Sequence, residues 1–159
     1  SLTGTLETPL KRFDLMHAIN TRGTFLTTKT CVPFLRRAPN PHVLVLSPPL
    51  DMQAKWFRDH VAYSIAKYGM SLCVLGMAEE FRAEGIAINA LWPRSVINTA
   101  ALAMIPGIDT RGCRKPEILA DAAIFPPDDV IASLEGAQDT SGNNQRIDIW
   151  EEFKQAIGG

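Results

Sequence analysis

An excess of charge of either sign is the first thing that this sequence of 159 residues lacks. Lysine and arginine number 16, against 17 aspartates and glutamates, and the formal net charge is −1. Proteins that bind nucleic acid present a basic stripe or patch to the phosphates, and the sequence contains none. Nucleic-acid binding therefore has no electrostatic support. With 46% hydrophobic and 21% charged residues, the chain has the composition of one globular domain with a substantial core.

Cysteine, histidine and long apolar runs are also scarce. The three cysteines stand far apart, and the three histidines form no pair four residues apart, so we expect neither a metal site nor a disulfide framework. An odd number of scattered thiols fits a reducing compartment. We expect no membrane span, because no apolar run looks long enough to cross a bilayer.

The most informative feature that is present is a tyrosine and a lysine four residues apart. Tyr63 and Lys67 stand near the start of a long apolar stretch that predicts a helix over residues 62–82. One helical turn separates them, so both side chains leave the same face. A phenol is a poor acid at neutral pH, and an ammonium group beside it favours the phenolate. The pair suits proton donation to a carbonyl that is reduced by hydride, although the same spacing more often marks a half-buried ring and a solvated amine.

The surrounding segments predict an α/β fold. The expected strands are short apolar runs at 43–46, 86–91 and 146–150. The expected helices span 11–37, 62–82, 116–124 and 126–134. We expect residues 94–115 to be irregular. This alternation of helix and strand is typical of a doubly wound parallel sheet.

The order of four polar residues along these elements carries a family resemblance. Asn20 lies in the first predicted helix, Ser47 directly follows the first strand, and Tyr63 and Lys67 begin the next helix. The second predicted strand then contains Asn89-Ala90-Leu91 and is followed by Trp92-Pro93. This order of residues resembles the C-terminal half of the short-chain dehydrogenase/reductase family. Residues 47–49 and 62–71 are most similar to its hydroxysteroid dehydrogenase-like branch. The resemblance covers nearly the whole chain and implies a Rossmann-like fold.

A glycine-rich turn for dinucleotide phosphates is absent from the sequence. It contains neither G-x-G-x-x-G nor G-x-x-x-G-x-G. In the family this turn precedes the segment that matches Ser1, so the resemblance implies that about three to four strand–helix units, roughly 100 residues, are missing. We interpret residues 1–159 as the C-terminal part of one domain, holding its catalytic and nicotinamide side. The chain alone is expected to be inactive.

The resemblance implies a catalytic role for each of the four polar residues. Tyr63 is expected to act as general acid/base, and Lys67 to assist it and to hold the nicotinamide ribose. Asn20 is expected to bend its helix and hold a water that links the lysine to solvent. Ser47 is expected to orient the substrate, although the family's serine stands one position later, where this chain has Pro48. The alternative interpretations are a packed ring for Tyr63, a solvated amine for Lys67 and a capped or kinked turn for Asn20.

The implied cofactor is NAD or NADP, and the residues that distinguish the two would lie in the absent part. Pro93, Arg94 and Thr99 match positions beside the nicotinamide, although Arg94 stands where the family has glycine and Thr99 is displaced by one residue. Residues 94–125 correspond to the substrate lid, and its apolar residues favour a small lipophilic substrate.

These residues predict an NAD(P)-dependent oxidoreductase that interconverts a lipophilic carbonyl and a secondary alcohol. The alternative is a non-catalytic assembly or lipid-binding module, which Pro48, Arg94 and the absent glycine turn favour. Helices 11–37 and 62–82 match those that pair in the family's dimers, so we expect a homodimer or homotetramer. A cytoplasmic location is expected, with the peroxisome or mitochondrion as the alternative.

Overall fold

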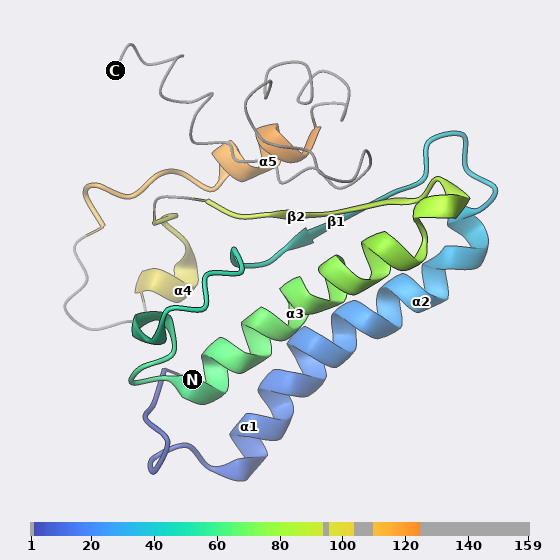
Figure 1. The fold of residues 1–159 in the computed structure, drawn as a ribbon. Coiled ribbons are helices and arrows are strands. Elements are labelled where there is room, and N and C mark those ends of the chain that lie inside the picture. The colour runs from blue at the N-terminus through green and yellow to red at the C-terminus, as the bar shows by residue number, and fades with distance from the viewer. Residues whose placement is uncertain (1, 94–95, 104–109, 125–159) are drawn as a thin grey trace. The chain divides into compact units, whose positions relative to one another are not determined.

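A computed structural model describes residues 2–93, 96–103 and 110–124 (Figure 1). The chain divides into two compact units, and the boundary between them falls after Ala90. The first unit contains two paired strands and the helices that pack on them. The second contains two short helices, and each unit is described by itself.

A long interrupted helix opens the first unit. Helix α1 spans Leu10–His17, a π-helical turn spans Ala18–Arg22, and helix α2 spans Gly23–Leu35. The predicted helix over 11–37 is thus confirmed, with a π-helical turn in its middle. Asn20 lies in that turn, where its Nδ2 donates to the Met16 carbonyl at 2.8 Å. Turns of this kind are uncommon and are frequently found at functional sites.

The sheet of the first unit pairs two strands in parallel. Strand β1 spans His42–Leu46 and strand β2 spans Ala87–Leu91, which confirms both predicted strands to within a residue. Helix α3, Val61–Glu80, connects them, as parallel strands require. The chain returns through a 3-10 turn and Gly85, whose φ of 71° is readily adopted by glycine. Helices α2 and α3 lie side by side on the sheet (Figure 1).

Apolar burial holds these layers together. The largest fully buried side chains are Ile86, Ile88 and Leu91, in and beside β2. Strand β2 is therefore enclosed almost completely, as expected for a strand in a parallel sheet. The buried face of α3 carries these residues: Ala62, Ser64, Ala66, Tyr68, Ser71, Val74, Met77 and Ala78.

Helix α3 also has the length and apolar character of a membrane span. In the part of the chain that the structure describes, it alone meets both criteria, so the expectation that no run is long enough was wrong on that count. Core helices meet the same criteria, and 44% of its apolar window is buried. Its buried face contains Ser64, Tyr68 and Ser71, whose hydroxyls bond to the protein, as suits a core helix.

The second unit contains helix α4, Ala100–Ala103, and helix α5, Glu117–Ile124. An isolated parallel bridge joins Ile97 to Arg114. Helix α5 confirms the helix predicted over 116–124. The expectation of a wholly irregular segment over 94–115 was wrong, because an alanine-rich turn, favourable to helix, forms α4. The predicted helix over 126–134 and strand over 146–150 lie outside the described residues.

Helix α3 approaches the π-helical turn closely at Gly69. Thr21 Oγ1 donates to the Ala66 carbonyl at 3.0 Å. A Cβ at Gly69 would lie 2.8 Å from Thr21 Cγ2 and closer still to its Oγ1. Threonine is stiff at χ1, so its side chain cannot turn away without losing that hydrogen bond. Glycine at position 69 therefore permits the contact between the two helices.

We predict that Gly69→Ala lowers the free energy of unfolding by about 1–3 kcal/mol, the usual range for overpacking. Gly76→Ala in the same helix is the matched control, because a Cβ there meets nothing within 4 Å. That control should stabilise the protein by about 0.5–1 kcal/mol, the helical preference of alanine over glycine. Urea unfolding measures both variants. Equal effects of the two substitutions would contradict the close-packing argument.

A polar pair, the half-buried His42 and the buried Asn89, links the two strands. Asn89 Nδ2 donates to His42 Nε2 at 3.2 Å, and Asn89 is 6% exposed. Burial lowers the pKa of His42. The accepting nitrogen must be unprotonated, so the native pair contains the neutral imidazole.

We predict that the free energy of unfolding falls as the pH is lowered through about 6.5, the ordinary histidine pKa. Below that pH the unfolded chain takes up a proton at His42 that the folded chain resists, and the loss continues down to the folded pKa. Urea unfolding at pH values between 5 and 8 measures this slope. His42→Gln keeps a neutral polar side chain and should flatten the slope. An unchanged slope in that variant would assign the pH dependence to another group.

Candidate active site

The carboxyl end of β1 is the first part of the candidate site. Ser47 follows the strand, is only 4% exposed, and its Oγ has no hydrogen-bond partner among the described residues. Buried hydroxyls normally have a partner, so an unpartnered one at a strand end is a candidate ligand contact. Pro48 occupies the next position, and its carbonyl accepts a hydrogen bond from Ser71 Oγ at 2.6 Å.

Lys67 extends from α3 to the same strand end. Its Nζ lies 3.4 Å from the carbonyl oxygen of Leu46, the residue before Ser47, and 3.3 Å from Met70 Sδ. The pKa of Lys67 is lowered by burial. Residues 21 positions apart in the chain are thereby brought together. The structure thus places a half-buried amine beside the backbone that carries the unpartnered hydroxyl.

Tyr63 lies one turn before Lys67, near the start of α3. The residue is 37% exposed, which leaves part of it accessible from solvent. Its ring meets the His60 ring edge to face, with centroids 6.1 Å apart and planes at 79°. The helical spacing of Tyr63 and Lys67 directs both side chains to one face of α3, as predicted.

The π-helical turn is attached to the part of α3 that carries Lys67. Asn20 is half-buried in this turn, and its neighbour Thr21 donates to the carbonyl of Ala66, the residue before Lys67. Cys73 Sγ also lies 3.9 Å from the Thr21 carbonyl oxygen. Asn20 therefore lies in an irregular, π-helical turn, and Thr21 links that turn to the helical turn of Lys67.

The loop that joins β1 to α3 includes the loop predicted over residues 50–60, and its attachment to α3 was not predicted. Three hydroxyls on the buried face of α3 donate to three of its carbonyls: Ser64 to Trp56 at 2.7 Å, Tyr68 to Asp51 at 2.6 Å and Ser71 to Pro48 at 2.6 Å. Their spacing along α3 is close to one and two helical turns. Polar residues repeated at that interval inside an apolar helix were the available sequence signal.

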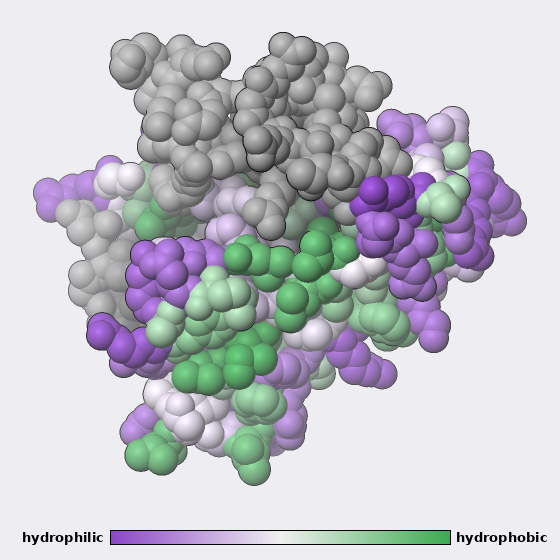
Figure 2. Space-filling view, in the orientation of Figure 1, coloured by the Kyte–Doolittle hydropathy of each residue, from purple (hydrophilic) through white to green (hydrophobic). Residues whose placement is uncertain are grey.

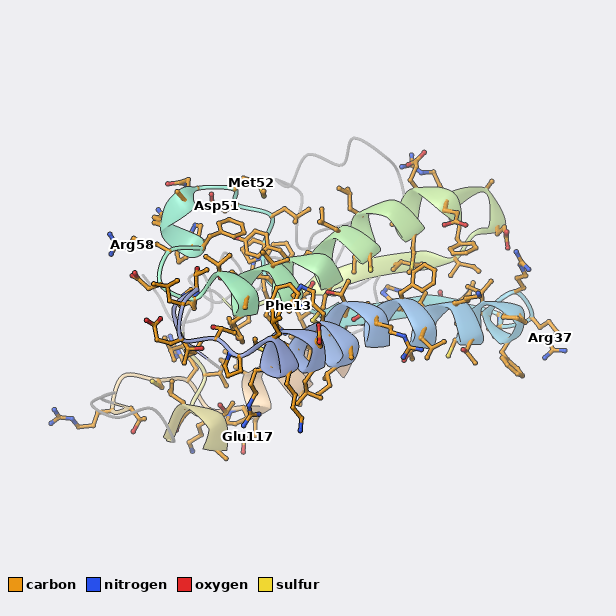
Figure 3. The ribbon with its side chains drawn as sticks, turned by 90° about the horizontal axis from the view of Figure 1, so that it is seen from below. Phe13, Arg37, Asp51, Met52, Arg58 and Glu117 are labelled. Atoms are coloured by element: carbon orange, nitrogen blue, oxygen red, sulfur yellow. The ribbon has the colours of Figure 1, made fainter. Side chains whose placement is uncertain are left out.

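Asp51 organises the same loop from within. Its carboxylate accepts hydrogen bonds from Trp56 Nε1 at 2.6 Å, Gln53 N at 3.0 Å and Gln53 Nε2 at 3.1 Å. The Trp56 hydrogen bond makes the largest contribution to lowering the pKa of Asp51. Figure 3 shows Asp51 and Met52 in this loop beside the start of α3. The loop is thus held in one conformation between Ser47 and Tyr63.

Of the predicted cofactor contacts, Tyr63 and Lys67 lie in the first unit, and Pro93, Arg94 and Thr99 belong to the second. Pro93 follows β2 and is exposed. Thr99 is also exposed, and its Oγ1 accepts from Leu102 N at 3.4 Å, at the start of α4. Arg94 lies outside the described residues. The structure therefore describes Pro93 and Thr99 within their own unit, and their proximity to Tyr63 stays a prediction.

Comparison with known proteins identifies the family of this chain. The sequence model of a family described as enoyl-(acyl carrier protein) reductase matches residues 2–119. That stretch contains every predicted site residue. The chain belongs to the short-chain dehydrogenase/reductase family. The resemblance predicted from the order of the motifs is thereby confirmed, and so is the Rossmann-like fold class.

Individual relatives extend the comparison. Hydroxysteroid dehydrogenase-like protein 2 of Rattus norvegicus is 62% identical over 124 residues, which cover 77% of this chain and 24% of the relative. A candidate dehydrogenase of Xanthomonas campestris, known from its crystal structure, is 47% identical with a TM-score of 0.78, over 99% of this chain and 54% of that one. A short-chain dehydrogenase of Mycobacterium thermoresistibile is 40% identical with a TM-score of 0.70, over 94% and 60%. This chain therefore spans about a quarter of the rat relative's length.

We predict opposite effects on stability for two equally buried serines. Ser47→Ala removes a hydroxyl that has no partner among the described residues, so the free energy of unfolding should stay unchanged or rise. Ser71→Ala leaves the Pro48 carbonyl without its donor and should lower that free energy by about 1–3 kcal/mol. Thermal unfolding of both variants measures the difference. Destabilisation of similar size in both would mean that the Ser47 hydroxyl has a structural bond.

Proposed function

We propose that the protein to which this chain belongs is an NAD(P)-dependent oxidoreductase. It interconverts a lipophilic carbonyl and a secondary alcohol by hydride transfer, with Tyr63 as general acid/base. The observation that carries this proposal is the convergence of α3 and β1. Lys67 Nζ lies 3.4 Å from the Leu46 carbonyl, directly before the unpartnered Ser47 hydroxyl, and Tyr63 lies one turn away on the same helix face.

Each of these residues has a distinct part in the proposed reaction. The Ser47 hydroxyl donates to the substrate oxygen, because no other group among the described residues engages it. Tyr63 gives its phenolic proton to that oxygen as negative charge develops there. Lys67 supplies positive charge on the same helix face. Asn20, in the π-helical turn linked to Ala66 through Thr21, holds the bend and contributes a polar group on that side of Lys67.

The residues present fit one end of a nicotinamide dinucleotide. Ligands of parallel α/β sheets bind at the carboxyl ends of the strands, and Ser47, Lys67 and Pro93 belong to or reach the ends of β1 and β2. We propose that Lys67, Pro93, Arg94 and Thr99 contact the nicotinamide end of NAD or NADP, which supplies the hydride when bound. The sequence contains no glycine-rich turn of the kind that holds a pyrophosphate, and no role toward that group is proposed for its residues.

A lipophilic substrate is favoured by apolar side chains around the loop that joins β1 to α3. Leu46 is 54% exposed, Met52 is 72% exposed and Trp56 is 48% exposed. Leu46 directly precedes Ser47, Met52 and Trp56 lie between Ser47 and Tyr63 in the sequence, and all three belong to the first unit. Residues 94–125 are proposed to act as the substrate lid.

We also propose that the protein assembles as a homodimer or homotetramer through the long helices. Large apolar residues are exposed on helix α1, the π-helical turn and α2, at Leu15, Ile19 and Leu26, and on α3, at Ile65, Leu72 and Leu75. Figure 2 shows apolar side chains gathered over α2 and α3. Exposed apolar surface of this kind marks an interaction site in many proteins.

We predict that Tyr63→Phe lowers the turnover of the full-length protein by roughly 100-fold or more, as loss of a general acid does. Binding of NADH and NADPH should be retained, because only the phenolic hydroxyl is removed. Tyr68→Phe is the matched control: it removes the same atom five residues later, where the hydroxyl bonds the Asp51 carbonyl. The measurement is nicotinamide oxidation with a panel of lipophilic ketones.

Two results would count against the enzymatic proposal. Equal turnover in wild type and Tyr63→Phe would remove the mechanism. A full-length protein that binds no nicotinamide cofactor, yet binds an apolar ligand and oligomerises, would support the non-catalytic alternative, for which the replacement of the family's serine by Pro48 is the specific observation.

A further inference from the structure

His60, the residue before the first turn of α3, belongs to a hydrogen-bonded chain that the proposed reaction does not use. Its Nδ1 lies 2.9 Å from Ser64 Oγ, and the Ser64 hydroxyl donates to the Trp56 carbonyl at 2.7 Å. A serine hydroxyl has one proton, and that proton is engaged by Trp56. His60 Nδ1 must therefore be the donor to Ser64 Oγ. Nδ1 carries a proton in this neutral tautomer and in the imidazolium, so the bond persists whichever form is present.

The other contact of His60 is with Tyr63. The two rings meet edge to face at 6.1 Å between centroids and 79° between planes, an arrangement that aromatic rings prefer. Because Nδ1 is bonded to Ser64, rotation of the His60 ring is restricted. A ring restricted in this way limits the orientations open to the partly exposed Tyr63 ring beside it.

The backbone before α3 supports the placement of His60. Asp59 has a φ of 70°, and apart from glycine it is the one residue with positive φ in the described part of the chain. Aspartate tolerates this conformation better than most residues, yet it remains strained. The resulting turn brings His60 to the start of α3, with its amide 3.4 Å from the Phe57 carbonyl.

The chain of contacts extends to the loop that joins β1 to α3. Trp56, whose carbonyl accepts from Ser64, is itself held through its indole Nε1 by the Asp51 carboxylate at 2.6 Å. Asp51 also accepts at its carbonyl from Tyr68, on α3. The hydrogen bonds from His60 through Ser64 to Trp56 therefore continue to Asp51, which in turn accepts a hydrogen bond from Tyr68 on α3.

We propose that His60 is a positioning residue for Tyr63, held by Ser64 and the Asp51–Trp56 loop. Its ring sets the orientation of the Tyr63 phenol toward the strand end that carries Ser47. This inference rests on the proposed catalytic role of Tyr63 for its effect on turnover. Its effect on the Tyr63 ring itself does not require that role.

Two substitutions separate the ring contact from the hydrogen bond. His60→Asn retains a donor close to the position of Nδ1 but removes the ring that meets Tyr63. His60→Phe retains a ring and removes the donor. In the full-length protein, we expect His60→Asn to lower kcat by roughly tenfold, with KM for the cofactor unchanged, since a small misplacement of a reacting group is costly. His60→Phe should lower kcat less than His60→Asn does, because it keeps the ring but loses the hydrogen bond that holds it.

A second readout follows the Tyr63 ring without turnover. The protein is labelled with ring-13C tyrosine, and the Tyr63 signal is identified by its loss in Tyr63→Phe. His60→Asn should shift and broaden that signal, and His60→Phe should shift it less. His17→Asn is the matched control, because His17 also stacks on a ring, that of Phe13 at 4.1 Å, and bonds a neighbour through Nδ1, but on α1. It should leave the Tyr63 signal and kcat unchanged.

The outcomes distinguish this inference from the proposed function. A Tyr63 signal that is the same in wild type and His60→Asn overturns the inference whether or not the protein turns over. Equal losses of kcat in His60→Asn and His60→Phe also overturn it, because the ring would then have no separate effect. A Tyr63 signal that responds as expected in a protein without turnover supports the positioning by His60 and rejects the reductase.

Discussion

The structure depends on three hydrogen bonds that attach helix α3 to the loop after β1. Ser64, Tyr68 and Ser71 lie on the buried face of a mostly apolar helix, and each donates to a loop carbonyl. A single bond of this kind adds only about 0.5–1.5 kcal/mol, but a buried carbonyl left without a donor costs about 1–3 kcal/mol. The pattern of donors and acceptors therefore selects one position of the helix along the loop. Lys67 reaches the end of β1 because that position is selected.

The π-helical turn contacts α3 at a second place, away from the loop after β1. A π-helical turn is less regular than an α-helix, and the long helix contains one at Ala18–Arg22. There Thr21 bonds the Ala66 carbonyl, and Gly69 leaves room for the threonine side chain. The result is a close approach of two backbones at the helical turn that carries Lys67. The π-helical turn and the absence of a side chain at Gly69 thus together permit this close packing beside Lys67.

Several elements were predictable because their signals are local. The apolar periodicity over 11–37 and 62–82 and the branched apolar runs over 43–46 and 86–91 became helices and strands close to the predicted bounds. The family resemblance implied an irregularity at Asn20, and apolar periodicity alone does not locate the π-helical turn found there. Helix α4 was missed because a stretch with only four helical residues has too few turns to show a period. The loop over 50–60 was predicted, but the hydrogen bonds that hold it were not, because their donors lie on another element, α3.

The sequence by itself determined the types of chemical group and their spacing on α3. A helix repeats every 3.6 residues, so Tyr63 and Lys67 had to share a face wherever the helix lay. Only the tertiary structure decided that Lys67 Nζ reaches the Leu46 carbonyl, that the buried Ser47 hydroxyl is without a partner among the described residues, and that His60 donates to Ser64 beside Tyr63. The physical reason is that these contacts depend on which hydrogen-bonding groups are already engaged. The pairing of donors and acceptors is decided when the helix, the loop and the strand pack together, so a local sequence pattern cannot predict it.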